Sequence, residues 1–153
     1  KIDKAPSNFF WIGFILTLFP NSKIIHIKRN IKDNCLSIYK NLFGGNRTDW
    51  TYDVENIQKY VKIYKEMMEF WNNKFGSKIY EVNYEDLVQN QETEIKNLLS
   101  FCDLKFEIEC LEHHKSKNPI KTVSINQSRK PIYKDSIKSN LKFQKFNELF
   151  KDI

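Results

Sequence analysis

Two short β-branched runs, each followed by a helical pattern, constrain the fold of this chain most. They occupy 23–28, which reads Lys-Ile-Ile-His-Ile-Lys, and 78–83, where Ile79 and Val82 are the β-branched members. Strands that alternate with helices lie parallel in one sheet, because each helix returns the chain to the same edge. We therefore predict an α/β fold in which helices wrap a parallel sheet. Two strands are too few for a stable parallel sheet, so further strands are expected before Lys1.

Apolar residues recur at three- and four-residue steps through much of the remaining chain, which predicts helices. The longest stripe, over 53–75, favours a core helix over a cofactor contact. The other expected helices cover 8–18 with Ser7 or Asn8 as the cap, 31–43, 91–102, 106–113 and 137–150. A turn is expected at 84–86, and a long loop rich in Ser, Asn, Lys and Pro is expected at 115–131.

Length and composition bound the class of protein. The chain has 153 residues, which fits one domain with a core of its own. Its 41% hydrophobic content argues against disorder, and 25 Lys and Arg against 19 Asp and Glu favour anionic partners. Nucleic acid, nucleotide and acidic peptide all suit that charge. Because Cys35, Cys102 and Cys110 include no Cys-x-x-Cys pair, we expect reduced thiols in a cytoplasmic protein.

The apolar run from Phe9 to Phe19 predicts a buried helix rather than a membrane anchor. It covers only about half of the roughly 20 residues that a membrane span needs. The chain opens Lys-Ile-Asp-Lys, without an initiator Met or a signal peptide, which suggests a fragment of a longer protein.

Arg29 follows the first β-branched run, just before the next helix is expected to begin. Open α/β folds present polyanion sites at the carboxyl edge of a strand, and a guanidinium offers a planar fork for phosphate-like oxygens. Ser37 lies about two turns into the following helix, so its hydroxyl shares a ligand with Arg29 only if the intervening turn allows it. The alternative is an ordinary buried strand followed by solvated Lys28 and Arg29.

Other kinds of site find little support in the sequence. His113 and His114 are adjacent and His26 lies within an expected strand, which does not match the spacing of zinc ligands. No Gly-x-Ser-x-Gly or Cys-His arrangement indicates a nucleophilic triad. The four glycines form no phosphate-cradling Gly-x-x-x-x-Gly-Lys loop, so any nucleotide site in this chain is incomplete.

Four motifs in this order resemble the C-terminal two-thirds of a sulfotransferase domain. They are Asp3-Lys4-Ala5-Pro6 with Phe19-Pro20-Asn21, the unit from Ile24 to Ser37, Asn83-Tyr84-Glu85-Asp86-Leu87-Val88, and the stretch from Thr122 to Tyr133. The resemblance runs from Lys1 to about Lys138. It is nearest to bacterial sulfotransferases often joined to tetratricopeptide repeats, and tyrosylprotein sulfotransferases are more distant.

The resemblance implies a fold and a reaction. The fold is a P-loop-like three-layer sandwich with a parallel sheet, and its first strand and phosphosulfate loop are expected upstream, so that residues 1–153 are a partial single domain. The family transfers a sulfuryl group from 3′-phosphoadenosine 5′-phosphosulfate (PAPS) to an acceptor hydroxyl or amine without a metal. Protein tyrosine, other proteins, carbohydrates and small molecules all remain open as acceptors.

The resemblance also assigns roles to residues. Lys4 matches the lysine that steadies charge on the transferring sulfate, and Ser124 matches a serine that helps to stabilise the transition state. Arg29 and Ser37 match the pair that holds the 3′-phosphate, and Tyr84 matches a residue near the nucleotide. The loop over 124–133 closes over the donor in the family, which makes donor-binding candidates of Ser124, Gln127, Arg129, Lys130 and Tyr133.

Two departures from the family pattern concern cations. Where tyrosylprotein sulfotransferases carry a second phosphate-binding arginine, this chain has Asn41 beside Lys40. A cation expected near the end falls on Ser139, beside Lys138. The glycine-rich phosphosulfate loop and the acidic general base, which the family carries upstream, do not occur in this chain. We therefore expect part of a sulfotransferase that is inactive as this segment alone.

Plainer interpretations exist for each motif. Lys4 suits a solvated residue before a helix, Tyr84 a capping or packing tyrosine, and Lys130 a solvated loop lysine. Two other functions also stay open: a non-catalytic sulfotransferase-like interaction domain and a basic nucleic-acid-binding module. The second needs a clustered basic face, whereas the lysines are scattered along every expected helix, so no nucleic-acid partner is expected.

Overall fold

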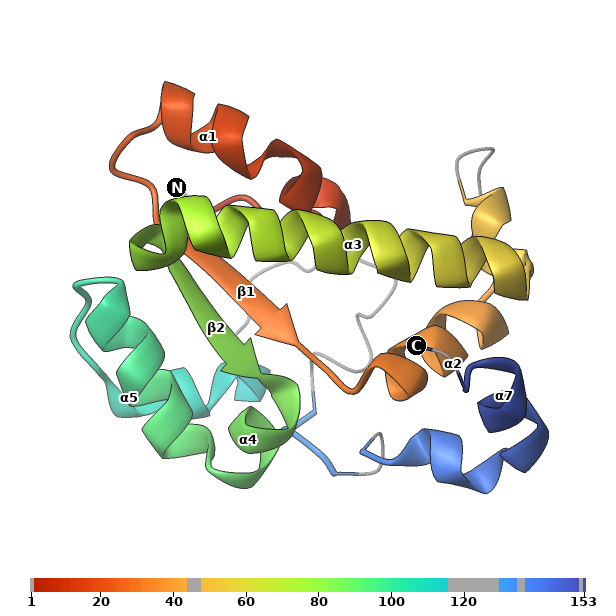
Figure 1. Cartoon of the computed structure of the whole chain (residues 1–153). Coiled ribbons are helices and arrows are strands. Elements are labelled where there is room, and N and C mark those ends of the chain that lie inside the picture. The colour runs from red at the N-terminus through yellow and green to blue at the C-terminus, as the bar shows by residue number, and fades with distance from the viewer. Residues whose placement is uncertain (1, 44–47, 116–129, 135–136, 152) are drawn as a thin grey trace.

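The computed structural model describes residues 2–43, 48–115, 130–134, 137–151 and 153. Within these residues, β1 (Ile24–Lys28) and β2 (Ile79–Asn83) form a two-stranded sheet at the centre of the molecule (Figure 1). The strands are parallel, and their register places Ile24 opposite Ile79 and Lys28 opposite Asn83. The predicted parallel pairing is therefore confirmed, and the chain is a mixed α/β protein.

The first two α-helices after β1 begin at capping side chains. Asn30 caps α2 (Ile31–Lys40) and Asp53 caps α3 (Val54–Phe75); each side chain accepts a hydrogen bond from a first-turn amide, at 3.1 and 2.8 Å respectively. The predicted range of α3 is confirmed. The prediction that α2 continues to about residue 43 is wrong, because the backbone is already extended at Asn41.

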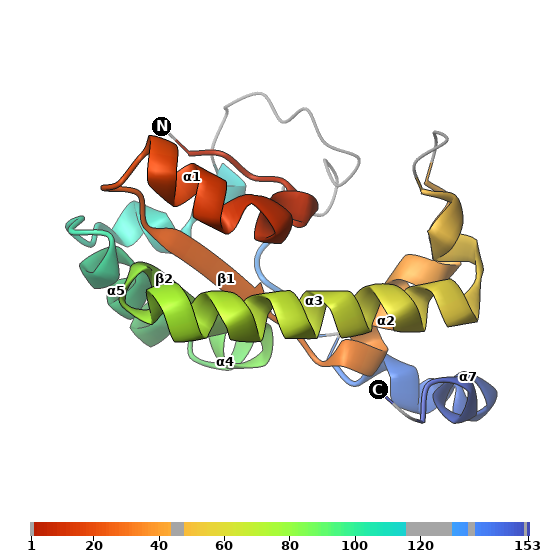
Figure 2. The ribbon, with the colours of Figure 1, turned by 45° about the horizontal axis from the view of Figure 1, so that its top comes forward.

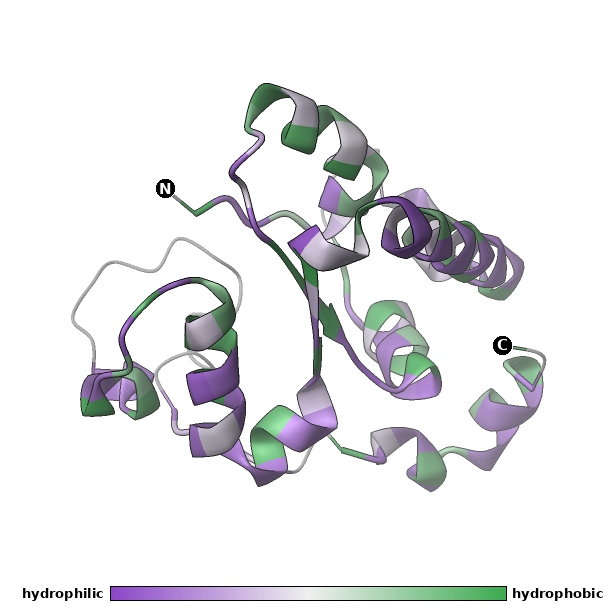
Figure 3. Cartoon of the chain, turned by 60° about the vertical axis from the view of Figure 1, so that its left-hand side comes forward, coloured by the Kyte–Doolittle hydropathy of each residue, from purple (hydrophilic) through white to green (hydrophobic). Residues whose placement is uncertain are grey.

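α3 and the N-terminal helices cover one face of the sheet (Figure 3). η1 (Pro6–Trp11), a 3₁₀ helix, leads directly into α1 (Ile12–Leu18), and no side chain caps η1, so the predicted cap at Ser7 or Asn8 is wrong. Buried apolar side chains fill the layer between these helices and the sheet; they are Phe9, Ile12, Leu16, Met68 and Ile79.

The close approach of α1 to α3 depends on Gly13. A Cβ atom at this position would stand 2.7 Å from Cη2 of Trp71, which is too near for any real contact. Trp71 Nε1 also donates a hydrogen bond of 2.7 Å to the Phe9 carbonyl. The indole therefore joins the N-terminal helices to α3 through packing and through one partly buried hydrogen bond.

The other face of the sheet carries α4 (Tyr84–Gln89) and α5 (Gln91–Phe101) (Figure 3). The rings of Tyr80 and Phe101 stack with their centroids 5.1 Å apart, which joins β2 to α5. Lys23, just before β1, donates to the Phe101 carbonyl and to the Asp103 carboxylate. The turn predicted at 84–86 is wrong, because these residues form the first turn of α4.

The C-terminal part of the chain returns to α2 (Figures 1 and 2). η6 (Ser139–Lys142) and α7 (Gln144–Leu149) stand where one helix over 137–150 was predicted. A second buried cluster joins this part to α2 and α3; its members are Cys35, Leu36, Ile57, Val61, Phe146 and Phe150. The core of the described protein is thus divided between the two ends of α3.

The described residues contain four further short 3₁₀ helices. η2 (Asp49–Tyr52) precedes α3, and η3 (Gly76–Lys78) joins α3 to β2. The helix predicted at 106–113 is wrong, because that region holds only the short η4 (Ile108–Leu111), followed by η5 (His113–Lys115). Most of the long loop predicted at 115–131 lies outside the described residues.

None of the helices that the structure describes has the length and hydrophobicity that crossing a bilayer requires.

Candidate functional site

Arg29 and Tyr84 meet at the carboxyl edge of the sheet. The register pairs Lys28 with Asn83, so the next residue of each strand leaves the sheet at the same point. The guanidinium carbon of Arg29 lies 5.2 Å from the centroid of the Tyr84 ring, within the range of a cation–π contact. The structure therefore brings together two of the residues predicted for the donor site, although they are 55 positions apart in the sequence.

The turns that follow the two strands are also joined. The backbone amide of Asn30 donates to Glu85 Oε1 at 2.9 Å, and Asn83 Nδ2 donates to Asp86 Oδ2 at 2.9 Å. From the first turn of α4, Glu85 thus reaches across to the residue that caps α2. This bond fixes the turn that carries Arg29 relative to the turn that carries Tyr84.

The other predicted residues lie on separate segments. Ser37 is half-buried on α2, the helix that follows Arg29, and Lys4 is exposed just before η1. Lys130 and Tyr133 are exposed, and the Lys130 carbonyl lies 3.1 Å from His113 Nε2. The predictions for Ser124, Gln127 and Arg129 fall outside the described residues.

A polar network under α3 braces the same end of β1. Glu81 accepts hydrogen bonds from Lys28 Nζ at 2.7 Å and from Asn72 Nδ2 at 3.0 Å, and its carboxylate lies 3.1 Å from His26 Nδ1. His26 Nε2 lies 2.5 Å from the Tyr64 hydroxyl. Lys28 therefore points toward α3 and away from the Arg29–Tyr84 contact. Of the two neighbouring cations, Lys28 binds Glu81 and Arg29 lies over the Tyr84 ring.

The network controls the charges of its members. Burial alone would raise the pKa of Glu81, but hydrogen bonds from Lys28, Asn72 and His26 outweigh it and lower the pKa to about 2. Burial lowers the pKa of His26, which is only partly offset by Glu81. Near neutral pH the network thus contains an ionised Glu81 and a neutral His26.

Asp33 is a buried carboxylate that sequence reasoning missed. Its side chain is on the first turn of α2, is only 1% exposed, and accepts hydrogen bonds from residues of the C-terminal segment. The partners lie more than 100 positions along the chain, so no local pattern identifies them. Acidic residues are common in the first turn of a helix, so Asp33 carries no sequence signal of its own.

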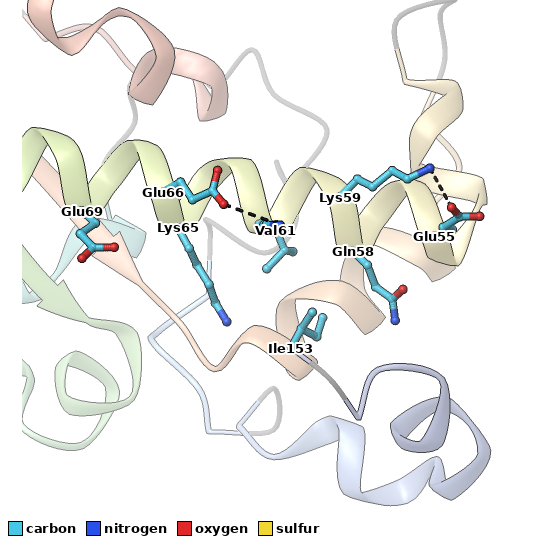
Figure 4. A pocket seen from close by; sticks show the side chains of 9 residues that line it. Glu55, Gln58, Lys59, Val61, Lys65, Glu66, Glu69 and Ile153 are labelled. Carbon is cyan, nitrogen blue, oxygen red and sulfur yellow. Dashed lines mark ion pairs between the residues drawn. The ribbon is translucent and has the colours of Figure 1, made fainter.

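A hollow of about 440 Å³ lies along α3, and Ile153 also lines it (Figure 4). Its charged lining residues are Glu55, Lys59, Lys62, Lys65, Glu66 and Glu69. Two ion pairs, Lys59–Glu55 at 2.7 Å and Lys62–Glu66 at 3.9 Å, use part of that charge. Because lysines and glutamates line the hollow in equal number, its charge offers no net attraction to a polyanion. Across the described ranges, no group of His, Cys, Asp or Glu side chains is arranged to hold a metal ion.

Comparison with known proteins identifies the family. The sequence model of the sulfotransferase family matches residues 1–108. The chain is 38% identical over 147 residues to an uncharacterized protein of Aquifex aeolicus, covering 95% of this chain and 19% of that protein. It is 30% identical over 115 residues to a Caenorhabditis briggsae protein named as a protein-tyrosine sulfotransferase, covering 73% of this chain and 40% of that protein.

A third relative is omega-hydroxy-beta-dihydromenaquinone-9 sulfotransferase Stf3 of Mycobacterium bovis, which is 28% identical over 116 residues. That match covers 71% of this chain and 30% of the relative. The chain thus spans less than half the length of each of these three proteins. The family match includes both strands, Arg29 and Tyr84, and the chain belongs to the sulfotransferase family.

Proposed function

We propose that this chain carries the 3′-phosphate end of the donor site of a PAPS-dependent sulfotransferase. The observation that supports it most is the contact of Arg29 with Tyr84 at the carboxyl edge of a parallel sheet. Ligands of open α/β sheets bind outside the carboxyl ends of the strands, where side chains of neighbouring strands converge. A guanidinium held over an aromatic ring is fixed in orientation, which suits it to bidentate contacts with phosphate oxygens.

The start of α2 adds to the attraction for an anion. α2 begins two residues after Arg29, and the partial positive charge of a helix N-terminus favours phosphate nearby. Ser37 offers a hydroxyl from the second turn of the same helix. We propose that Arg29 and Ser37 bind the 3′-phosphate and that Tyr84 orients Arg29 beside the nucleotide.

The proposed reaction moves the sulfuryl group from PAPS to an acceptor hydroxyl or amine. The bond between sulfur and the bridging phosphosulfate oxygen breaks, sulfur bonds to the acceptor, and 3′-phosphoadenosine 5′-phosphate (PAP) leaves with the electron pair. The acceptor proton goes to an acidic base that this chain does not carry. Lys4 and Ser124 stabilise charge on the transferring group, and residues of 124–133 cover the donor.

The complete domain is proposed to be a P-loop-like three-layer sandwich. Helices lie on both faces of the described sheet, which supports this architecture (Figure 3). The phosphosulfate loop and the base are assigned to a segment other than this chain. The three cysteines are all free, which supports a cytoplasmic location. The two named relatives carry different acceptors in their names, so no single acceptor class is assigned.

Calorimetric titration of the full-length protein with PAP tests the proposal. Arg29→Ala is expected to weaken PAP binding roughly 10- to 100-fold, as for loss of hydrogen bonds to a charged group. Lys28→Ala is the matched control. It also removes one positive charge, at the position next to Arg29, but the Lys28 side chain faces Glu81. Equal losses of PAP affinity in the two variants would show that the effect comes from general electrostatics. A wild type that does not bind PAP would overturn the proposed function.

A further inference from the structure

α1 carries an exposed apolar face. Trp11 and Phe14 are each 60% exposed and Leu18 is 54% exposed, whereas Ile12 and Leu16 on the same helix are buried. Spacings of three and four residues place Trp11, Phe14 and Leu18 on one side of the helix, and the rings of the first two meet edge-on with their centroids 6.5 Å apart. We call these three residues the outer face of α1. The prediction of a buried helix therefore holds for one side of α1 only.

A further exposed ring lies on α3 beside α1. Trp71 packs against Gly13 of α1, and the ring of Phe70 meets the Trp71 ring edge-on at 4.8 Å. Phe70 is half exposed, and the ammonium of Lys74 lies 5.6 Å from the centroid of its ring. Figures 1 and 2 show α1 and α3 next to each other, with α1 at the periphery of the described protein. An exposed apolar surface of this kind marks a contact with a partner or with a membrane.

The surroundings of the outer face are basic. Residues 4–32 include five Lys and Arg and no Asp or Glu, and Figure 3 shows α1 itself in green and near-white. Lys78 Nζ donates a hydrogen bond of 3.2 Å to the Pro20 carbonyl, which places its ammonium just after the end of α1, and Lys4 is exposed just before η1. Asp3, the nearest acidic residue in the sequence, accepts a hydrogen bond of 2.8 Å from a side chain of η1. Cations therefore stand toward both ends of the N-terminal helices, which favours a negatively charged partner.

An anionic lipid surface suits the outer face better than a second copy of the chain does. Two copies that met through this face would bring equal cations together, and like charges across an interface cost free energy. Trp, Phe and Leu side chains are favoured at the boundary between lipid headgroups and acyl chains, and lysines beside them are attracted to anionic lipids. Helices with such a face lie in the plane of the interface and do not cross the bilayer.

We propose that the outer face of α1 docks the protein onto the surface of an anionic lipid bilayer. The rings of Trp11 and Phe14 and the side chain of Leu18 enter the headgroup region, while Lys74 and Lys78 face the lipid phosphates. The proposal goes beyond the proposed function, because docking requires neither the donor nor the sheet edge. Anionic lipids are enriched in the cytoplasmic leaflet, which agrees with the proposed cytoplasmic location.

Flotation of the full-length protein with lipid vesicles tests the docking. Vesicles of phosphatidylcholine and phosphatidylserine in equal amounts should carry the wild type upward, and Phe14→Ser should weaken vesicle binding about tenfold, because it removes a ring that leaves water on docking. Phe143→Ser is the matched control: Phe143, at the end of η6, is also half exposed, and its loss should leave flotation unchanged. PAP affinity should be the same in both variants as in the wild type, which separates docking from the donor site.

The lysines provide a second measurement. Lys74→Gln should weaken binding to the same vesicles about fivefold, whereas Lys142→Gln, on η6, should not change it. A wild type that does not float, or equal losses in Phe14→Ser and Phe143→Ser, would overturn the docking while the proposed function stands. A dimer in solution that Phe14→Ser dissociates would also overturn it, by showing that a second copy covers the outer face. A wild type that floats but does not bind PAP would overturn the proposed function alone.

Discussion

The α1–α3 layer and the carboxyl edge of the sheet are built on different principles. In the layer, apolar side chains of Phe9, Ile12 and Met68 pack over one face of the sheet, and only a few polar bonds such as that of Trp71 are needed. At the edge, Arg29, Asn30 and Glu85 hold two turns together almost entirely by charge and hydrogen bonds. The layer provides stability, and the edge provides directed polar groups.

The two regions should respond differently to substitution. Burial of apolar area is the main source of folding free energy, so the layer is expected to govern unfolding. Half-exposed cations contribute little to stability but bind anions well once they are oriented. Variants of the apolar layer should therefore change the free energy of unfolding, whereas variants of the sheet edge should change the binding or turnover of the donor.

The largest expected effect is on stability, from Ile12→Ala. Ile12 is 3% exposed within the layer, and truncation there should lower the free energy of unfolding by about 2–5 kcal/mol. Urea unfolding followed by circular dichroism measures this loss. PAP affinity, measured well below the unfolding transition, should stay at the wild-type value. A loss of affinity in the folded variant would break the proposed separation.

Lys4→Ala should change catalysis rather than binding. If Lys4 stabilises charge in the transition state, as proposed, its loss should lower turnover about 100-fold, with a much smaller change in donor affinity. Release of PAP from PAPS by the full-length protein, screened over several acceptor hydroxyls and amines, measures turnover, and calorimetry measures affinity. Equal losses in both quantities would assign Lys4 a binding role alone.

Tyr84 variants test the aromatic support of Arg29. Tyr84→Ala removes the ring that lies under the guanidinium and should weaken PAP binding about two- to fivefold, in line with an exposed cation–π contact of about 0.5–1 kcal/mol. Tyr84→Phe keeps the ring and should bind PAP as the wild type does. If Tyr84→Phe were as weak as Tyr84→Ala, the hydroxyl rather than the ring would be the important group.

The smallest expected effect is a pH dependence from Glu81, whose carboxylate braces β1 beneath α3. Its pKa is about 2 in the folded protein and ordinarily 4.5, so the ionised form is favoured by folding. The stability that Glu81 contributes is present above pH 4.5 and is lost as the pH falls toward 2. The difference in urea midpoint between the wild type and Glu81→Gln should therefore shrink over this range. A difference in urea midpoint that stays constant over this pH range would show that ionised Glu81 does not contribute to the stability of the sheet.

Periodicity in the sequence was enough for α3 and for the parallel pairing, whereas the prediction that the helix over 9–19 is buried is wrong for Trp11 and Phe14, each 60% exposed. The stripe that predicts α3 needs no knowledge of distant residues, and the two β-branched runs mark both strands. Because strands in parallel register end together, the sequence also led to Arg29 as a residue at the sheet edge. Apolar spacing is local information, and local elements follow from it.

The polar contacts of the edge could not be predicted in the same way. Glu85 bonds to Asn30 and Asp33 bonds to Asn140, across 55 and 107 positions, and neither pair leaves a mark in the spacing of residues. The error at 84–86 has the same origin, because Tyr84 begins a helix immediately after β2 without a Gly or Pro to mark the change. Tertiary contacts decide such positions, and a single sequence carries little record of them.

The most direct test compares PAP with adenosine 5′-monophosphate, which lacks the 3′-phosphate, on the wild type and on Arg29→Ala. If Arg29 holds the 3′-phosphate, Arg29→Ala should weaken PAP binding roughly 10- to 100-fold and leave the binding of adenosine 5′-monophosphate nearly unchanged. The preference of the protein for PAP should then largely disappear. Equal weakening of both nucleotides, or a preference that survives the substitution, would contradict the account.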